Sequence, residues 1–188
     1  MPSLRADLLP HSANPTLPAL RLAAEIERAG ERFELRYELQ GELAGVLFPP
    51  PAAPWRTDGL WRHTCFELFC AVPGGSAYYE FNFSPAGAWA AYRFGGYRER
   101  LADPELRAAP LVTLGESGEA ATVDVRLDVT GLPRLAPHAP LEVALAAVVE
   151  TRGHAIGHFA LAHPAEQADF HDRRGFLLNL PGSGRRTR

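Results

Sequence analysis

The segment AYYEFNFSPAGAWAAYRF, residues 77–94, predicts a β-hairpin and, with it, an all-β fold. Apolar and polar side chains alternate with a period of two on both sides of the tetrapeptide SPAG (84–87), whose residue types suit a type I turn. A loop of two or four residues would pair Phe81 with Ala90 and make that face an apolar core. A three-residue loop would shift the register, so the assignment of the faces depends on the loop length.

Short alternating segments recur along the chain at spacings near ten residues, with glycine, proline or serine in most gaps. Further strands are expected at residues 19–30, 32–41, 64–72, 121–129, 141–151, 157–163 and 175–180. The first of these segments also fits an amphipathic helix, but Gly30 favours a hairpin with the second; residues 98–106 are a candidate helical turn. The predicted fold class is an all-β antiparallel β-sandwich, jelly-roll-like, of about ten strands with few or no helices.

A single domain is expected over residues 17–180, with a lead-in segment at residues 1–16 and a disordered tail at residues 181–188. The start of the chain contains Asp7 and several prolines but no apolar run of the kind that a signal peptide needs. No stretch approaches the roughly 18 apolar residues of a membrane span. We therefore expect a cytoplasmic protein that makes no membrane contact.

Arginine supplies all 19 basic residues of the chain, against 22 acidic residues. Without lysine, Schiff-base chemistry, pyridoxal-phosphate anchoring and P-loop phosphate binding are excluded. An anionic ligand would have to be bound by arginine, by histidine or by backbone N–H groups. The net charge of −3 is not that of a typical nucleic-acid-binding protein, so we expect no nucleic-acid partner.

Twelve of the 18 aromatic residues lie between positions 55 and 97, and one face of the predicted hairpin combines a ring with polar groups. In the expected register this face carries Glu80, Asn82, Trp89 and Arg93. Saccharides present C–H groups on one side and hydroxyls around the rim, which suits a flat ring beside carboxylate, amide and guanidinium groups. The alternative is a solvated sheet face, on which a Glu80–Arg93 pair contributes roughly a few tenths of a kcal/mol.

The preceding segment, DGLWRHTCFELF, extends this candidate site, because Trp61, His63 and Glu67 share one strand parity. Glu67 lies between apolar neighbours, and a carboxylate is rarely buried without a partner. It therefore either pairs with an arginine such as Arg93 or lines a pocket. If this strand neighbours the hairpin, Glu67 converges with the acidic and amide side chains there.

Histidine and aspartate residues gather near the C-terminus. They are His154, His158, His163, Asp169, His171 and Asp172. A structural metal ion is one interpretation, although the HxH…E…H order of cupin sites is missing. A structured loop that caps one end of the sandwich is the alternative that we prefer, with His171 closing the pocket; we assign no metal ligand and no cofactor.

Three strings of the sequence, LWRHTCFE, EFNFSPAGAWAAYRF and ALAHPAEQADFHDRRGFLLNL, resemble bacterial DOMON-like proteins, which are related to family 9 carbohydrate-binding modules. The resemblance covers residues 17–180 and implies a β-sandwich with a ligand groove on one sheet. Its wider relatives bind sugars or haem. Haem-binding relatives use a Met/His axial pair, and the only methionine here is Met1, so haem is not expected. Sugar-binding relatives stack the sugar on tryptophan, for which Trp61 and Trp89 are the candidates.

The sequence therefore predicts a non-catalytic module that binds a saccharide or another polyol-containing metabolite, as a monomer or homodimer. The predicted ligand-binding residues are Trp61, His63, Glu67, Glu80, Asn82, Trp89, Arg93 and His171. Two alternatives stay open. One is an enzyme that acts on a sugar-like substrate through the Glu67/Glu80 pair or a metal ion. The other is a structural or partner-binding domain whose aromatic residues all belong to the core.

Overall fold

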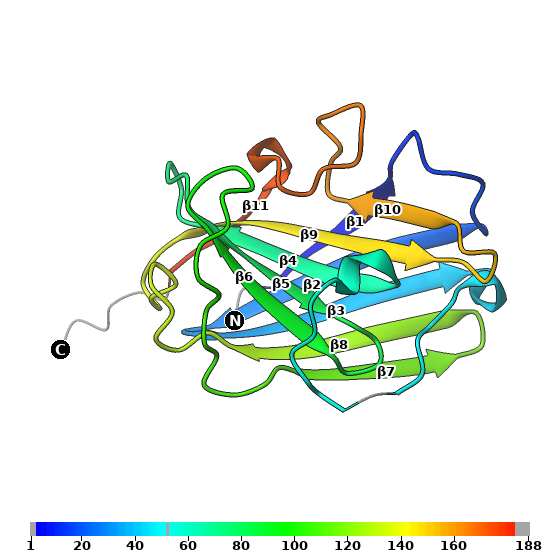
Figure 1. The fold of residues 1–188 in the computed structure, drawn as a ribbon, viewed down its shortest axis with the longest axis horizontal. Coiled ribbons are helices and arrows are strands. Elements are labelled where there is room, and N and C mark those ends of the chain that lie inside the picture. Colours follow the sequence, from blue (N-terminus) through cyan, green and yellow to red (C-terminus); the bar gives the residue numbers. More distant parts are fainter. Residues whose placement is uncertain (1–2, 52, 183–188) are drawn as a thin grey trace.

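The computed structural model describes residues 3–51 and 53–182 and consists mostly of β-strands and their connections (Figure 1). The strands are β1 (Ser3–Pro10), β2 (Leu20–Ala29), β3 (Arg32–Gly41), β4 (Cys65–Ala71), β5 (Tyr78–Phe83), β6 (Trp89–Phe94), β7 (Leu111–Ser117), β8 (Ala120–Asp128), β9 (Leu141–Glu150), β10 (Ile156–Ala160) and β11 (Leu178–Leu180). The single-turn 3-10 helices η1 (Leu43–Gly45), η2 (Leu60–Arg62) and η3 (Arg173–Gly175) lie in the connections. These described ranges contain no α-helix. None of the helices described has the length and apolarity that a membrane crossing requires.

The strands form one antiparallel sheet in the order β6-β5-β4-β9-β10-β1-β2-β3-β8-β7. Strand β11 pairs with residues 141–143 of β9, while β10 pairs with residues 146–150. Strand β1 joins the two halves, because Leu8 lies opposite Leu22 of β2 while Leu9 lies opposite Ala160 of β10. The sheet curls into a half-barrel, so the front arm (β6-β5-β4-β9-β10) faces the back arm (β2-β3-β8-β7) (Figure 1). The all-β antiparallel prediction is confirmed, whereas a sandwich of two separate sheets, jelly-roll-like, is not confirmed because the strand pairing continues through β1.

The back arm follows the alternation that the sequence predicts. In β3, the residues Phe33, Leu35, Tyr37 and Leu39 are buried inside the curl, and the residues between them are partly or fully exposed. The segment that also fitted a helix is strand β2, and Gly30, with a φ of +67°, forms part of the tight connection to β3.

The front arm is buried on both faces. All seven residues of β4 and all six residues of β5 are withdrawn from solvent. Their inner faces contribute Phe66 and Phe81 to the main core, where the ring of Phe66 lies 5.0 Å from that of Tyr37 on the back arm. Their outer faces carry a second apolar cluster that includes Phe69 and Tyr78 and packs beneath the connecting loops.

The β5–β6 hairpin closes through a three-residue loop, residues 85–87, and this corrects the expected register. The Ser84 N–H donates to the carbonyl oxygen of Ala88 at 2.8 Å, which makes these two residues the last pair before the loop. Gly87 adopts a φ of +102°, a conformation that favours glycine. The loop therefore has three residues, whereas the expected pairing required a loop of two or four residues.

The corrected register exchanges the residues on the two faces of β6. Glu80 lies opposite Tyr92, and Tyr79 lies opposite Arg93. Because side chains alternate along a strand, a shift of one residue places Tyr92 on the outer face and moves Trp89 and Arg93 to the inner face. The prediction that Trp89 and Arg93 share a face with Glu80 is therefore wrong.

Two strands lie outside the expected set. Strand β1 falls within the expected lead-in segment and pairs with both β2 and β10. Strand β7 is an edge strand with a largely exposed sequence, and residues 98–106 form turns and irregular structure instead of a helical turn.

The domain limits of 17 and 180 stay a prediction. Most of the tail expected to be disordered, residues 183–188, lies outside the described ranges.

Tyr37→Phe is expected to lower the free energy of unfolding by about 1 kcal/mol. The Tyr37 hydroxyl is buried and donates to the backbone carbonyl of Glu67 at 2.8 Å, so it joins the two arms. Ser76→Ala is the control, because the exposed Ser76 hydroxyl donates to the carbonyl oxygen of Gly95 at 2.9 Å, and its loss is expected to cost less than about 0.5 kcal/mol. Urea denaturation measures both, and equal losses would contradict the assigned role of Tyr37.

Candidate ligand-binding site

A pocket of about 350 Å³ opens on the outer face of the front arm. Its floor is formed by side chains of β4, β5, β6 and β9, namely Glu67, Glu80, Tyr92, Phe94 and Val148. Its walls come from η2, the β6–β7 connection and the segment between β10 and β11, here called the roof loop (residues 161–177). The wall residues are Trp61, Arg98, Arg100, Phe170 and His171.

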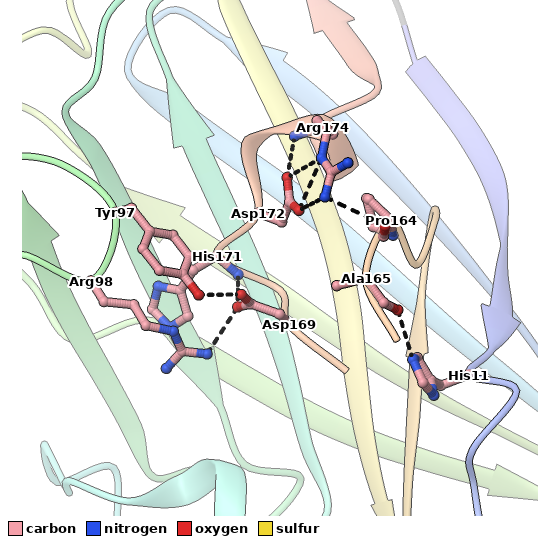
Figure 2. Close-up of polar contacts among 9 residues, drawn as sticks. All are labelled: His11, Tyr97, Arg98, Pro164, Ala165, Asp169, His171, Asp172 and Arg174. Carbon is pink, nitrogen blue, oxygen red and sulfur yellow. Dashed lines mark hydrogen bonds and ion pairs between the residues drawn. The ribbon is translucent and has the colours of Figure 1, made fainter. Parts of the chain in front are cut away.

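The roof loop is fastened at several points along its length (Figure 2). His11, which follows β1, makes a hydrogen bond of 3.3 Å from its Nε2 to the carbonyl oxygen of Ala165. Near the other end, the Asp172 carboxylate accepts the backbone N–H of Arg174 at 2.9 Å and so caps η3. The first contact fastens the loop to the segment after β1, and the second orders η3 inside the loop, from which the Arg173 Nη2 pairs with Glu142 on β9 at 2.5 Å.

Asp169 connects the roof loop to the β6–β7 connection (Figure 2). Its carboxylate accepts the Tyr97 hydroxyl at 2.5 Å, the Arg98 Nη2 at 2.8 Å and the backbone N–H of His171 at 3.1 Å. Hydrogen bonds to an ionised carboxylate are among the stronger ones in proteins. Asp169 thereby fixes Arg98 and His171 on the pocket wall.

Three buried polar residues form a row beneath the pocket. Glu67 on β4 lies directly opposite Asn82 on β5, and the Asn82 Nδ2 donates to Glu80 Oε1 at 2.7 Å. Two atoms of this row, Glu67 Oε1 and Asn82 Oδ1, are buried and have no hydrogen-bond partner among the residues that the structure describes. The three side chains that the sequence analysis expected to converge are thus brought together.

Burial determines the protonation of the two carboxyl groups. It raises the pKa of Glu67 well above the usual range, and the neighbouring Glu80 adds to the increase. Burial also raises the pKa of Glu80, to about 7, although the Asn82 N–H and the charges of Arg98 and Arg100 oppose it. Burial therefore favours the neutral carboxylic acid at Glu67, whereas Glu80, with a pKa of about 7, is close to half-ionised at neutral pH.

His171 closes one side of the pocket as a neutral imidazole. Burial lowers the pKa of His171 to about 4, with a further decrease from Arg98. The Tyr78 hydroxyl accepts the backbone N–H of Arg98 at 3.1 Å and lies 2.8 Å from His171 Nδ1; if the hydroxyl donates in this contact, the neutral imidazole carries its proton on Nε2. This Nε2 lies 3.6 Å from Glu80 Oε2, a contact that is not an ion pair while the imidazole is neutral.

Tyr92 supplies an aromatic surface between the floor and the walls. Its ring is edge-on to that of Trp61 at 6.0 Å, and the Arg100 guanidinium lies 4.5 Å from the centre of the Tyr92 ring. The Tyr92 hydroxyl donates to Asp58 at 2.9 Å, and Arg100 pairs with Asp103 at 2.8 Å. The wall arginines thus already have carboxylate partners.

The structure places Trp61, Glu67, Glu80 and His171 around the pocket, with Asn82 beneath it. Trp61 lies on η2 instead of on a strand and remains 42% exposed, which leaves ring surface for a ligand. These five positions remain candidates for binding.

Trp89, Arg93 and His63 are not among the residues that line the pocket. Trp89 packs against the main core and donates its Nε1–H to Pro54 at 3.0 Å, because the hairpin register turns it inward. Arg93 follows the same parity and lies opposite Tyr79, so it is not the ion-pair partner of Glu67 or Glu80.

His63 belongs to a different cluster. Its Nδ1 lies 2.7 Å from Glu150 Oε2, and His154 Nδ1 lies 2.7 Å from the other oxygen of the same carboxylate. Strand β4 begins at Cys65, so the strand parity that grouped His63 with Glu67 does not extend to it.

The sequence analysis missed Tyr92, Arg98, Arg100 and Phe170 as pocket residues. Tyr92 could have been predicted from the hairpin if the loop length had been known. A loop that is longer or shorter by one residue moves Tyr92 to the other face of the sheet. The arginines follow β6 in a segment without regular structure, for which hydropathy periodicity carries no signal.

The C-terminal histidines do not form one cluster. His154 is bound to Glu150, His163 Nε2 donates to the carbonyl of Leu9 at 2.8 Å, and His158 lines the pocket from β10. Within residues 3–51 and 53–182, no group of three or more His, Cys, Asp or Glu side chains is arranged to hold a metal ion.

A larger hollow of about 460 Å³ lies on the outer face of the back arm. Four of its charged side chains pair across the strands, Arg36 with Asp124 at 2.7 Å and Arg126 with Glu34 at 4.0 Å. These groups are solvent-exposed and satisfied, which is typical of a solvated sheet face. The smaller pocket, with its buried carboxyl groups, is the better candidate.

The fold and the site define an all-β protein with a polar pocket under the loops of one sheet arm. No protein-family model matches the sequence, and no curated protein matches it significantly. A solved structure from Bacteroides uniformis, described as a candidate carbohydrate-binding protein, is similar with a TM-score of 0.70 and 17% identity, over 97% of this chain and 86% of that chain.

Two solved structures of a family 9 carbohydrate-binding module from Caldicellulosiruptor kristjanssonii are similar with TM-scores of 0.53. The complex with glucose is 9% identical, over 97% of this chain and 86% of that one. The complex with cellotriose is 7% identical, over 95% and 83%. At these identities the likeness is one of fold.

Glu80→Gln is expected to stabilise the protein more at pH 8.5 than at pH 5. Because the pKa of Glu80 is raised from 4.5 to about 7 in the folded state, the folded protein binds more protons than the unfolded chain in this interval. Stability contributed by the protonated group is therefore lost as pH rises, by about 2–3 kcal/mol between the two pH values. Urea denaturation measures this, with the exposed Glu34→Gln on β3 as control; a difference independent of pH would contradict the burial of Glu80.

Proposed function

We propose that the pocket binds a saccharide or another polyol-containing metabolite and that the protein is a non-catalytic binding module. The observation that carries this proposal is the meeting, in one pocket, of two buried carboxyl groups, a partly exposed tryptophan and two arginines. The finer assignments, namely a DOMON-like protein with a β-sandwich fold, located in the cytoplasm as a monomer or homodimer, belong to the same proposal.

The chemistry of the pocket suits a polyol. Glu80 offers an acceptor for ligand hydroxyls, and the Arg98 and His171 N–H groups offer donors. Trp61 and Tyr92 offer apolar ring surface for the C–H face of a sugar. A site that combines apolar surface with a few convergent polar groups is typical of small-ligand binding.

The fold comparison supports the proposal at the level of architecture. The two family 9 modules are described in complex with glucose and with cellotriose, and the Bacteroides uniformis protein is described as a candidate for carbohydrate binding. These sugars are therefore the first ligands to test.

The alternative of a carboxylate-dependent glycosidase is less well supported. In such enzymes the two carboxyl groups flank the scissile bond from opposite sides. Here Glu67 and Glu80 lie on adjacent strands of one floor, with Asn82 bonded to Glu80. The third reading, a structural domain whose aromatic residues are all core, predicts no pocket and does not account for the partly exposed Trp61.

Trp61→Ala is expected to weaken saccharide binding about tenfold, since loss of a stacking ring removes roughly 1 kcal/mol or more of binding free energy. Isothermal titration calorimetry and thermal shift would screen glucose, cellotriose, uronic acids and sugar phosphates. Trp55→Ala is the matched control, because Trp55 is 73% exposed and is not a pocket residue. Absence of binding to the whole panel would overturn the proposal, and equal weakening by both variants would place the site elsewhere.

A further inference from the structure

Within residues 3–51 and 53–182, two buried oxygen atoms on adjacent strands lack hydrogen-bond donors, and their positions suggest what joins them. Glu67 Oε1 and Asn82 Oδ1 are the atoms, and their residues are direct cross-strand partners in the β4–β5 pairing. Both side chains are more than nine-tenths buried. Two buried acceptors on directly paired residues are destabilising unless a donor reaches them, and a proton on the carboxyl group would supply that donor.

The neighbours of Asn82 leave Glu67 as the available donor for its Oδ1. Across β6, Asn82 lies opposite Ala90, whose side chain has no polar atom. Along β5, Glu80 already accepts the Asn82 Nδ2–H, and the Ser84 hydroxyl, which accepts the backbone N–H of Ala86, makes no hydrogen bond to Asn82 Oδ1 within the described residues.

The neighbours of Glu67 lead to the same pairing. Its partner on β9 is Ala146, and Phe69 follows on the same outer face of β4. Cys65 precedes it on that face, and the Cys65 thiol is directed to the backbone oxygen of Phe66 at 3.8 Å. Asn82 is therefore the one polar side chain directly opposite Glu67 in the strand pairing.

We propose that Glu67 is a positioning residue that stays protonated and donates its O–H to Asn82 Oδ1, so that Asn82 holds Glu80 as the one ionised acceptor of the pocket. This inference rests on the proposed function of the site and deepens it. With its Oδ1 bound to Glu67, the Asn82 amide cannot flip, and its N–H₂ group remains directed at Glu80 Oε1. Glu80 Oε2 is then left for the hydroxyl of a ligand.

The consequence is binding that depends on pH through Glu80 alone. The charged and titratable groups around Glu80 are Glu67 on β4, Tyr78 on β5, Tyr92 on β6, Arg98 and Arg100 on the β6–β7 connection, and His171 on the roof loop. Cys65 on β4 and His158 on β10 complete the set, and burial raises the pKa of the thiol and lowers the pKa of the imidazole. Within this set, the pKa of Glu80, at about 7, lies between pH 6 and pH 8.5, and we assign the pH dependence to this group.

The sign of the effect follows from the role of Glu80 as acceptor. A ligand hydroxyl binds the ionised form of Glu80 better than the protonated form. Because the pKa of Glu80 is about 7, the affinity reaches its full value well above pH 7 and falls as the pH drops below 7. If the ionised form alone binds, the Kd rises about tenfold from pH 8 to pH 6. The site would therefore retain polyols at slightly alkaline pH and release them on acidification.

The first test uses the ligand-free, full-length protein. Carbon-13 NMR of the glutamate carboxyl groups, assigned with the Glu67→Gln and Glu80→Gln variants, should show Glu80 titrating near pH 7 and no inflection of Glu67 up to pH 9. The decisive measurement is the pH at which Glu80 titrates in the Glu67→Gln variant. It stays near 7 if Glu67 is neutral in the wild type, and it moves downward if Glu67 carries a charge, because the substitution then removes a nearby repulsion.

Glu67→Leu provides the contrast, because leucine has similar bulk but no donor for Asn82. The Glu80 inflection should move upward in Glu67→Leu and return to about 7 in Glu67→Gln, whose N–H₂ group can replace the carboxylic acid as donor. Should the leucine variant fail to fold, the wild-type titration and the Glu67→Gln spectrum still decide the question. A Glu67 inflection between pH 4 and 6 would overturn the proposal.

Binding of glucose and cellotriose, measured by calorimetry at pH 6, 7 and 8, forms the second test. The wild-type Kd should rise about tenfold between pH 8 and 6, Glu67→Gln should keep this dependence, and Glu80→Gln should lose it. Failure of both sugars to bind counts against the proposed function, while the NMR titration decides the protonation of Glu67 independently. A wild-type Kd that does not vary with pH would overturn the role of Glu80.

Discussion

The burial of both faces of β4 and β5 is the constraint on which the rest of the structure depends. The inner faces pack against the back arm, and the outer faces lie under η2, the β6–β7 connection and the roof loop. A strand in this position has no solvated face, so each polar side chain on it must find a partner within the protein or bind a ligand. This requirement applies to Glu67, Glu80 and Asn82.

The same burial gives two similar carboxyl groups different properties. Glu67 is buried, and its Oε1 has no hydrogen-bond partner in the part of the chain that the structure describes, whereas Glu80 receives the Asn82 N–H and lies near two guanidinium groups. The desolvation that disfavours a charge is therefore opposed at Glu80 and not at Glu67. His171 on the roof loop lies beside Glu80 and can act as a neutral N–H donor, because burial keeps its imidazole uncharged.

The fold itself is shared with proteins described as carbohydrate-binding, at identities where little sequence is held in common. A curled antiparallel sheet can keep its shape while its outer face and loops vary, because the inner core requires only apolar residues at alternating positions. Function must consequently be argued from the pocket, whose polar residues come from one arm and three connections.

The sequence by itself determined most of the strand content, the antiparallel fold class and the hairpin of β2 and β3. All of these follow from local periodicity and turn chemistry. The tertiary structure alone decided which face Trp89 and Arg93 occupy, because a single loop residue inverts every side chain of β6. It also brought Arg98, Phe170 and His171 over the sheet, since irregular connections are placed by long-range contacts such as those of Asp169 and carry no periodic signal.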